Sequence, residues 1–98
     1  MANVFSMPRP EDYKRAHQRI RKLWADGLVE IRHHAQQRMK ERKRDMTDID
    51  NVIKYGQITG HSKPMTLWRY TLDGKDVDGK RMRCVVEIDG SLIIVTVV

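Results

Sequence analysis

Residues 81–98 read RMRCVVEIDGSLIIVTVV, and this stretch decides the class of the fold. Apolar and polar side chains alternate over residues 81–88, with the two-residue period of a half-buried strand. Asp89 and Gly90 follow as a strong hairpin signal, and we expect a type I′ turn with positive φ at the glycine. Residues 91–98 are nearly all apolar and predict a central strand buried on both faces. The C-terminus is therefore expected to be an antiparallel hairpin.

Helical periods precede the strands. Steps of three or four residues between apolar side chains predict a helix over residues 11–26 and a more polar helix over residues 33–44. Thr47 and Asp50 resemble a capping box, so a third, short helix is expected to start near Asp48. The first helix is expected to dock through an apolar face that consists of Tyr13, Ala16, Ile20, Leu23 and Trp24.

Helices followed by strands are typical of an α+β domain. One more alternating strand is predicted over residues 67–72, and residues 28–31 form a short extended piece. We therefore expect two to three N-terminal helices packed on a twisted antiparallel sheet of three to four strands. The length of 98 residues suits one domain, assigned to residues 11–98, after a flexible segment at residues 1–10.

The formal charge of +6 comes entirely from the N-terminal half. Residues 1–44 carry 12 Lys and Arg against 5 Asp and Glu, whereas residues 45–98 carry 7 against 8. A basic surplus favours phosphate-bearing ligands or an acidic protein partner. The single Cys84 excludes an internal disulfide and, on the inward face between Met82 and Val86, is expected to be a small buried apolar residue. The four histidines lack paired ligand spacing, so no metal and no cofactor are expected. No long apolar run predicts a membrane helix or a secretory signal, so a cytoplasmic location is expected.

The second helix carries the first candidate site. His34, Arg38 and Arg42 are four residues apart and stack along one helix face. RNA cleavage without a metal needs a base for the 2′-hydroxyl proton, an acid for the leaving oxygen and cations for the developing charge on phosphate. A histidine beside two arginines has that chemistry. The alternative is a solvated basic helix with an incidental histidine.

The outward face of the strands carries the second candidate site. Arg69, Arg81 and Arg83 alternate outward, and Tyr70 or Trp68 is available for base stacking. Arginines and aromatic rings on a sheet hold single-stranded RNA by phosphate contact and stacking. The alternative is that both aromatic side chains belong to the core and that the arginines are ordinary surface residues.

Four segments of the chain resemble a known pattern in their order. They read HHAQQRMKER, TDIDNVIKYGQI, WRYTL and RMRCVVEIDGSLIIVTVV, and they are similar to the domain-of-unknown-function 4258 family. The chain also resembles the MqsR toxins in layout over residues 11–98. The resemblance implies a RelE/barnase-like fold and a metal-independent endoribonuclease of a toxin–antitoxin pair, neutralised by a cognate antitoxin protein. His34, Arg38 and Arg42 match the family's helix motif, and Tyr70 and Arg83 match its substrate-facing positions on the sheet.

The sequence departs from the MqsR toxins in one respect, because it lacks their lysine, glutamine and tyrosine set. Two hypotheses follow. The first is an RNase toxin that acts on RNA, with mRNA as the expected substrate. The second is a non-catalytic nucleic-acid-binding or regulatory domain with the same fold and basic surface.

Overall fold

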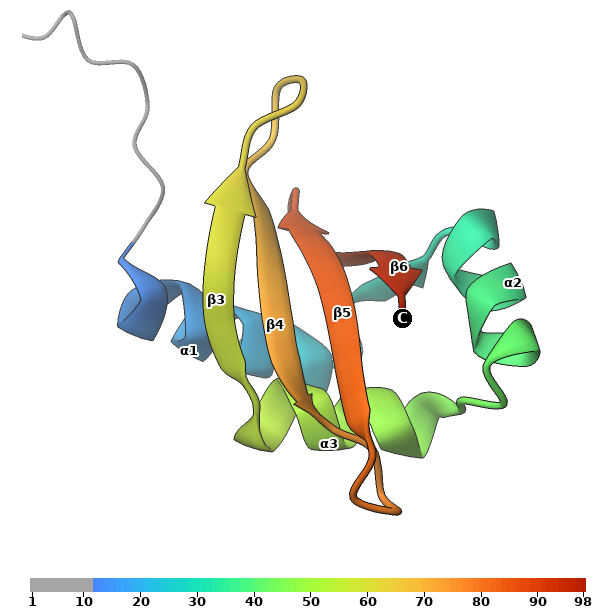
Figure 1. Cartoon of the computed structure of the whole chain (residues 1–98). Coiled ribbons are helices and arrows are strands. Elements are labelled where there is room, and N and C mark those ends of the chain that lie inside the picture. The colour runs from blue at the N-terminus through green and yellow to red at the C-terminus, as the bar shows by residue number, and fades with distance from the viewer. Residues whose placement is uncertain (1–11) are drawn as a thin grey trace, which may run out of the picture.

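The computed structural model describes residues 12–98, which form three helices and a five-stranded sheet (Figure 1). The expectation for residues 1–10 lies outside the described residues. The strand order is β2-β6-β5-β4-β3, and every neighbouring pair is antiparallel except β2 and β6, which are parallel. The elements are α1 (Tyr13–Ala25), β2 (Val29–Ile31), α2 (His33–Glu41), α3 (Met46–Tyr55), β3 (Gln57–Ser62), β4 (Arg69–Lys75), β5 (Arg81–Ile88) and β6 (Leu92–Val97).

The predicted α+β class is confirmed, and the sheet is wider than expected. The extended piece after α1 becomes β2, which joins the sheet through parallel pairing with β6. The strand β3 was not predicted, because its sequence QITGHS buries only one apolar side chain, Ile58. It exists because β4 supplies its hydrogen-bond partners.

The C-terminal hairpin forms as predicted, with a different turn. Ile88 pairs with Leu92, so three residues connect β5 to β6. Gly90 has a φ of +71°, but Asp89 does not have a positive φ, so the connection is not the expected type I′ turn. The strand β6 lies between β2 and β5, and its first three residues are buried on both faces of the sheet.

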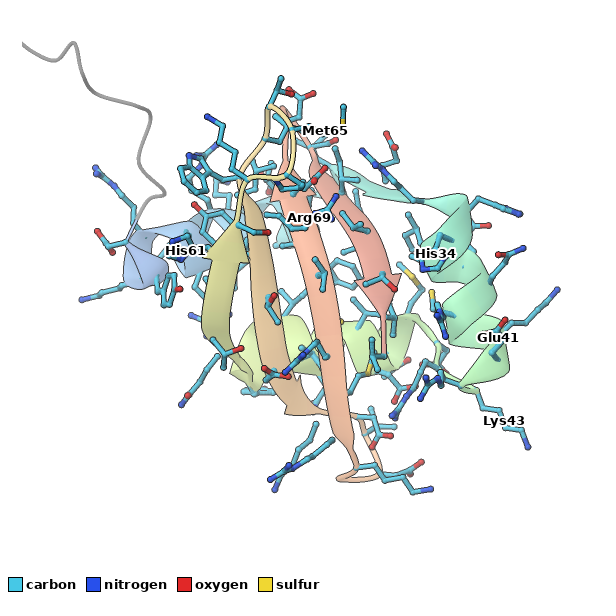
Figure 2. All side chains as sticks on the ribbon, turned by 45° about the horizontal axis from the view of Figure 1, so that its top comes forward. His34, Glu41, Lys43, His61, Met65 and Arg69 are labelled. Atoms are coloured by element: carbon cyan, nitrogen blue, oxygen red, sulfur yellow. The ribbon has the colours of Figure 1, made fainter. Side chains whose placement is uncertain are left out.

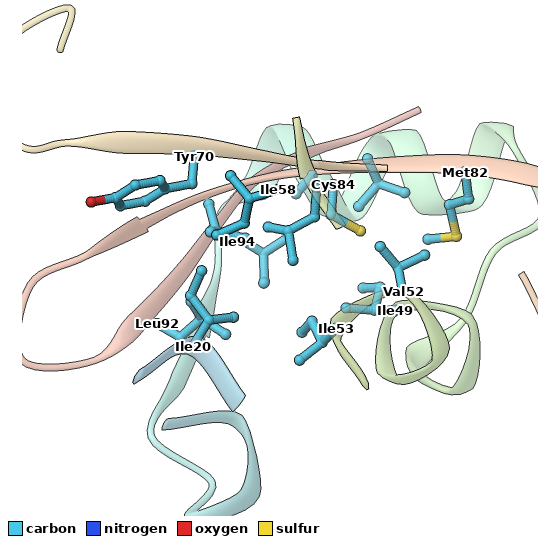
Figure 3. Close-up of a cluster of buried hydrophobic side chains, with 14 of the residues drawn as sticks. Ile20, Ile49, Val52, Ile53, Ile58, Tyr70, Met82, Cys84, Leu92 and Ile94 are labelled. Carbon is cyan, nitrogen blue, oxygen red and sulfur yellow. The ribbon is translucent and has the colours of Figure 1, made fainter. Parts of the chain in front are cut away.

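The core lies between one face of the sheet and the helices α1 and α3 (Figures 1 and 3). Helix α1 contributes Ala16, His17 and Ile20, while Leu23 and Trp24 are half-buried. Tyr13 was expected in this face, but its side chain lies at the surface and its hydroxyl is 2.7 Å from Nδ1 of His61.

Helix α3 begins two residues earlier than predicted. Asp45 is the N-cap, and its carboxylate accepts from the backbone N–H groups of Thr47 and Asp48, while Asp48 bonds back to the Asp45 N–H. This is a capping box, formed by Asp45 and Asp48 instead of Thr47 and Asp50. Burial opposes ionisation of Asp48, but the N–H donors of Asp45 and Val77 and the nearby Arg44 charge leave its pKa lowered.

Helix α2 ends at Glu41, three residues before the predicted end. Lys43 adopts a φ of +55°, and the next N–H, that of Arg44, returns to the carbonyl of Met39 at 2.8 Å. A left-handed residue followed by such a return bond ends a helix. The chain therefore turns here, and the side chain of Arg44 reaches the loop between β4 and β5.

Candidate nucleic-acid interface

The sheet face opposite α1 and α3 carries charged side chains at its outward positions on β4 and β5, and they form pairs across the strands. Arg69 lies opposite Glu87 in the β4–β5 register, and its Nη2 is 2.9 Å from a Glu87 carboxylate oxygen. Nη2 of Arg32 lies 3.4 Å from the other oxygen of Glu87. Glu87 is only 5 % exposed, so two arginines neutralise a carboxylate held close to the sheet.

Arg83 is also paired. It lies opposite Asp73 in the register, and its Nε and Nη2 donate to the two Asp73 oxygens at 2.9 and 3.2 Å. These hydrogen bonds are the largest cause of the lowered pKa of Asp73, to which the Thr59 hydroxyl also donates. The Asp73 carboxylate in turn raises the pKa of Arg83. The guanidinium groups of Arg69 and Arg83 are therefore both paired with carboxylates of the same sheet face.

A hollow of about 380 Å³ lies at the end of this face where β4 leaves the sheet and β5 enters it. It is lined by Lys75, Arg81 and Arg83, together with Gly74 and one acidic residue, Asp73. Three cations against one carboxylate give the hollow a positive charge, which suits a phosphate group. Among residues 12–98, no side chain forms an ion pair with Arg81.

Helix α2 borders the open face and is tied to the sheet at both ends (Figures 1 and 2). Arg32 precedes the helix and pairs with Glu87 on β5. Arg44 follows the helix, pairs with Asp76 and donates from Nη2 to the carbonyl of Arg81 at 3.1 Å. The C-terminal end of α2 therefore lies at the same end of the molecule as the cationic hollow.

The three predicted residues of α2 are accessible. His34 is exposed and lies on the side of α2 that faces the sheet, whereas Glu41 and Lys43 point away from it (Figure 2). Arg38 is 3.7 Å from the carboxylate of Glu41, and Arg42 follows the last helical residue. Within the described residues, no proton-transfer group lies within hydrogen-bond distance of His34. A cleavage reaction would therefore need its second proton from the RNA, from water or from a residue that moves.

Tyr70 does not lie where base stacking requires it. Its side chain is 2 % exposed and packs in the core, so the assignment of Tyr70 as an RNA-binding residue is corrected. Trp68 is half-buried, with the Lys63 ammonium 5.3 Å from its ring centroid and His61 against its edge. The alternative interpretation, in which both aromatic side chains belong to the core, is therefore correct for the buried Tyr70. Trp68 packs against the core but is only half-buried.

The sequence reasoning missed the carboxylates. Asp73, Asp76 and Glu87 each hold an arginine, and two of them lie opposite their arginine in the β4–β5 register. The same alternation that points Arg81 and Arg83 outward also points Glu87 outward, but only the register between β4 and β5 shows which arginine each carboxylate meets. Lys75 was missed because the predicted strand ended at residue 72.

Cys84 is buried, as expected for a small apolar core residue. Burial is the largest cause that raises the pKa of its thiol, to about 12, so the thiolate needed for nucleophilic chemistry is scarce at neutral pH. In the part of the chain that the structure describes, no three His, Cys, Asp or Glu side chains gather closely enough to hold a metal ion. None of the helices in residues 12–98 has the length and apolar character needed to cross a bilayer.

A family model described as a domain of unknown function, DUF4258, matches residues 31–98. The matched region starts at the last residue of β2 and includes α2, α3 and the strands β3 to β6, so it contains every residue of the interface described above. No curated protein matches the chain.

Proposed function

The chain belongs to the DUF4258 family, and we propose that it binds RNA on the open face of its sheet and cleaves it as a metal-independent endoribonuclease. One observation carries this proposal. The hollow lined by Lys75, Arg81 and Arg83 lies beside the end of α2, which is itself basic. A polyanion that crosses this end of the molecule would meet cations from both elements, and phosphate contacts supply most of the affinity for nucleic acid.

In the proposed reaction, His34 takes the proton of a 2′-hydroxyl while that oxygen attacks the adjacent phosphorus. The bond from phosphorus to the 5′-oxygen breaks, and this oxygen leaves with a proton taken from water, which produces a 2′,3′-cyclic phosphate and a 5′-hydroxyl. Arg38, about one turn along the helix from His34, stabilises the additional negative charge on the phosphate oxygens. Arg42 and Arg81 lie at the C-terminal end of α2, about two turns from His34, and would hold neighbouring phosphates of the same RNA strand. His34 suits this role because it is exposed beside the sheet and because a histidine side chain can accept and donate a proton.

A second candidate function, RNA binding without cleavage, is favoured by the ion pairs of the sheet. Arg69 and Arg83 are held by Glu87 and Asp73, so each would have to leave a carboxylate before it could stabilise a transition state. Lys75 and Arg81, which form no ion pair within residues 12–98, still leave a positive surface, and such a surface binds nucleic acid in a salt-dependent way.

Cleavage of a labelled single-stranded RNA in the presence of a chelator separates the two functions. The ribonuclease proposal expects products with 2′,3′-cyclic phosphate ends. His34→Ala should remove most of the cleavage and leave RNA binding and the melting temperature nearly unchanged. His33→Ala is a matched control, because His33 is also exposed but points about 100° away on the same helix. Equal cleavage by the two variants would exclude His34 as the proton-transfer group, and binding without any cleavage would favour the second function.

The resemblance to the MqsR and RelE-like toxins extends the proposal to a cytoplasmic toxin with a cognate antitoxin. Growth arrest on expression tests this extension. The arrest should be relieved by His34→Ala and retained by His33→Ala. Arrest that is equal for the two variants would contradict a toxin that acts through RNA cleavage by His34.

A further inference from the structure

The two outer edges of the sheet are protected to different degrees. The strand β3 carries a register shift between Ile58 and Gly60, and its four other side chains are polar and exposed. Bulges and polar side chains are the usual means by which proteins keep an edge strand from pairing. The strand β2 forms the other edge, and its three residues pair with β6 without a register shift. The neighbouring Leu28 is 50 % exposed.

The outward backbone groups of β2 can be assigned from its hydrogen bonds. The carbonyl of Leu28 accepts from the Leu92 N–H at 2.8 Å, and the Arg32 N–H donates to the Ile94 carbonyl at 3.1 Å. Because backbone groups alternate along a strand, those of Val29 and Ile31 point away from β6. The Ile31 carbonyl accepts from Nε2 of Gln36 at 3.0 Å. The N–H and carbonyl of Val29 and the N–H of Ile31 therefore line the free edge.

The side chains on the two faces of β2 differ in character. On the helix side, Val29 and Ile31 line an apolar groove of about 280 Å³ with Trp24, Gly27 and Met46. Met46 is 46 % exposed, although it is a large apolar residue. On the opposite side, Glu30 is exposed, and within residues 12–98 no cation forms an ion pair with it.

We propose that β2 binds an extended segment of a protein partner by strand addition. A basic residue of that segment lies opposite Glu30, and the apolar residues on either side of it enter the groove beside Val29 and Ile31. Backbone pairing supplies affinity in this binding mode, and alternate side chains supply specificity. The inference does not depend on the proposed ribonuclease activity, since the free edge of β2 shares no residue with the cationic hollow or with His34, Arg38 and Arg42.

A second copy of the chain is a poorer occupant. Antiparallel pairing of two β2 strands about a two-fold axis through the central residue would place Glu30 directly opposite Glu30 of the other copy. Like charges directly opposite each other destabilise a strand pair, and opposite charges stabilise it. Glu30 therefore disfavours self-pairing and selects a partner with a basic residue.

The test uses two blocked peptides, Thr-Thr-Val-Lys-Val-Thr-Thr and the same peptide with glutamate in place of lysine, titrated into the full chain labelled with ¹⁵N. The lysine peptide should shift the amide signals of residues 28–32 and slow hydrogen exchange at Ile31. The glutamate peptide should bind about fivefold more weakly or worse. Glu30→Lys should reverse the order of the two peptides. Glu41→Lys, an equal charge change at an exposed site on α2, should leave the order unchanged.

A second variant tests the groove without altering the charge of Glu30. Met46→Glu should weaken binding of both peptides and preserve their order. Each variant is first compared with the parent chain by its amide spectrum. The proposal is overturned if no peptide shifts residues 28–32, if Glu30→Lys leaves the peptide order unchanged, or if the Ile31 amide is already protected in a dimer without peptide.

Discussion

Arg44 and Asp76 form a buried ion pair that joins the end of α2 to the turn between β4 and β5. The side chains are only 13 % and 5 % exposed. Oδ1 of Asp76 also accepts from the backbone N–H groups of Asp78 and Lys80, at 2.9 and 2.8 Å. The Asp76 carboxylate therefore both stabilises the turn between β4 and β5 and, through Arg44, fixes the end of α2 to this turn. Because the same turn leads into Arg81, this pair fixes the basic end of α2 beside the cationic hollow.

Asp76→Ala should destabilise the protein by about 3–5 kcal/mol, because it leaves the Arg44 guanidinium buried without its partner. Urea denaturation measures this loss. The double variant Arg44→Met with Asp76→Asn should recover part of it, since it leaves no lone buried charge and keeps an oxygen that can accept from the turn amides. The single variants Arg44→Met and Asp76→Asn complete the cycle. If their losses of unfolding free energy simply add up to the loss in the double variant, direct coupling between Arg44 and Asp76 is contradicted.

Asp73→Asn should strengthen RNA binding by releasing Arg83 and removing the only acidic side chain of the hollow. The slope of log affinity against log salt should become steeper by up to about 1, the amount expected for one additional phosphate contact. Asp78→Asn, an exposed site in the neighbouring turn, is the matched control. Salt slopes that are the same for both variants would show that RNA does not contact Arg83.

Two glycines should respond differently to alanine, because they are required for different reasons. Gly90→Ala should cost about 1–2 kcal/mol from its φ of +71° alone, since a Cβ there meets nothing within 4 Å. Gly56→Ala should cost more, because its Cβ would lie 2.5 Å from the Val52 carbonyl oxygen and 2.8 Å from that of Asp73. Thermal midpoints give the order, and a larger loss for Gly90→Ala would contradict the close approach of α3 to β4.

Stability should fall as the pH decreases from 7 to 5, through His17. Burial lowers the pKa of His17 in the native state, although the hydrogen bond to the Ile53 carbonyl partly opposes this effect. Above about pH 6.5, histidine is neutral in both states. Below that pH, the unfolded chain binds a proton that the native state resists, so the free energy of unfolding decreases until the lower native pKa is passed.

Urea denaturation of the parent chain and of His17→Gln across this pH range tests the assignment. The variant should lose a large part of the slope between pH 7 and 5. If His17→Gln leaves the pH dependence of the unfolding free energy unchanged, groups other than His17 cause it.

The sequence predicted those helices and strands whose pattern of apolar and polar side chains shows which face is buried. Alternation from Arg81 to Ile88 and the apolar run after Gly90 gave two strands with nearly correct bounds, because period and burial are local properties. The predicted end of α2 and the predicted start of α3 differed from the structure by three and two residues. The end of α2 depends on the left-handed conformation of Lys43. Glycine or asparagine usually adopts this conformation at a helix end, so a lysine there does not predict it.

By itself, the sequence determined the order of helices and strands, the basic surplus, the lone buried cysteine and the spacing of His34 and Arg38 along one face of α2. Tertiary structure decided the rest of the interface. The pairs Arg69–Glu87, Arg83–Asp73 and Arg44–Asp76 join residues 18, 10 and 32 positions apart. Strand β3 and the free edge of β2 likewise arise from pairing between distant segments. Periodicity records which side of a segment faces the core, but the register between segments sets which charges meet and which edge stays open.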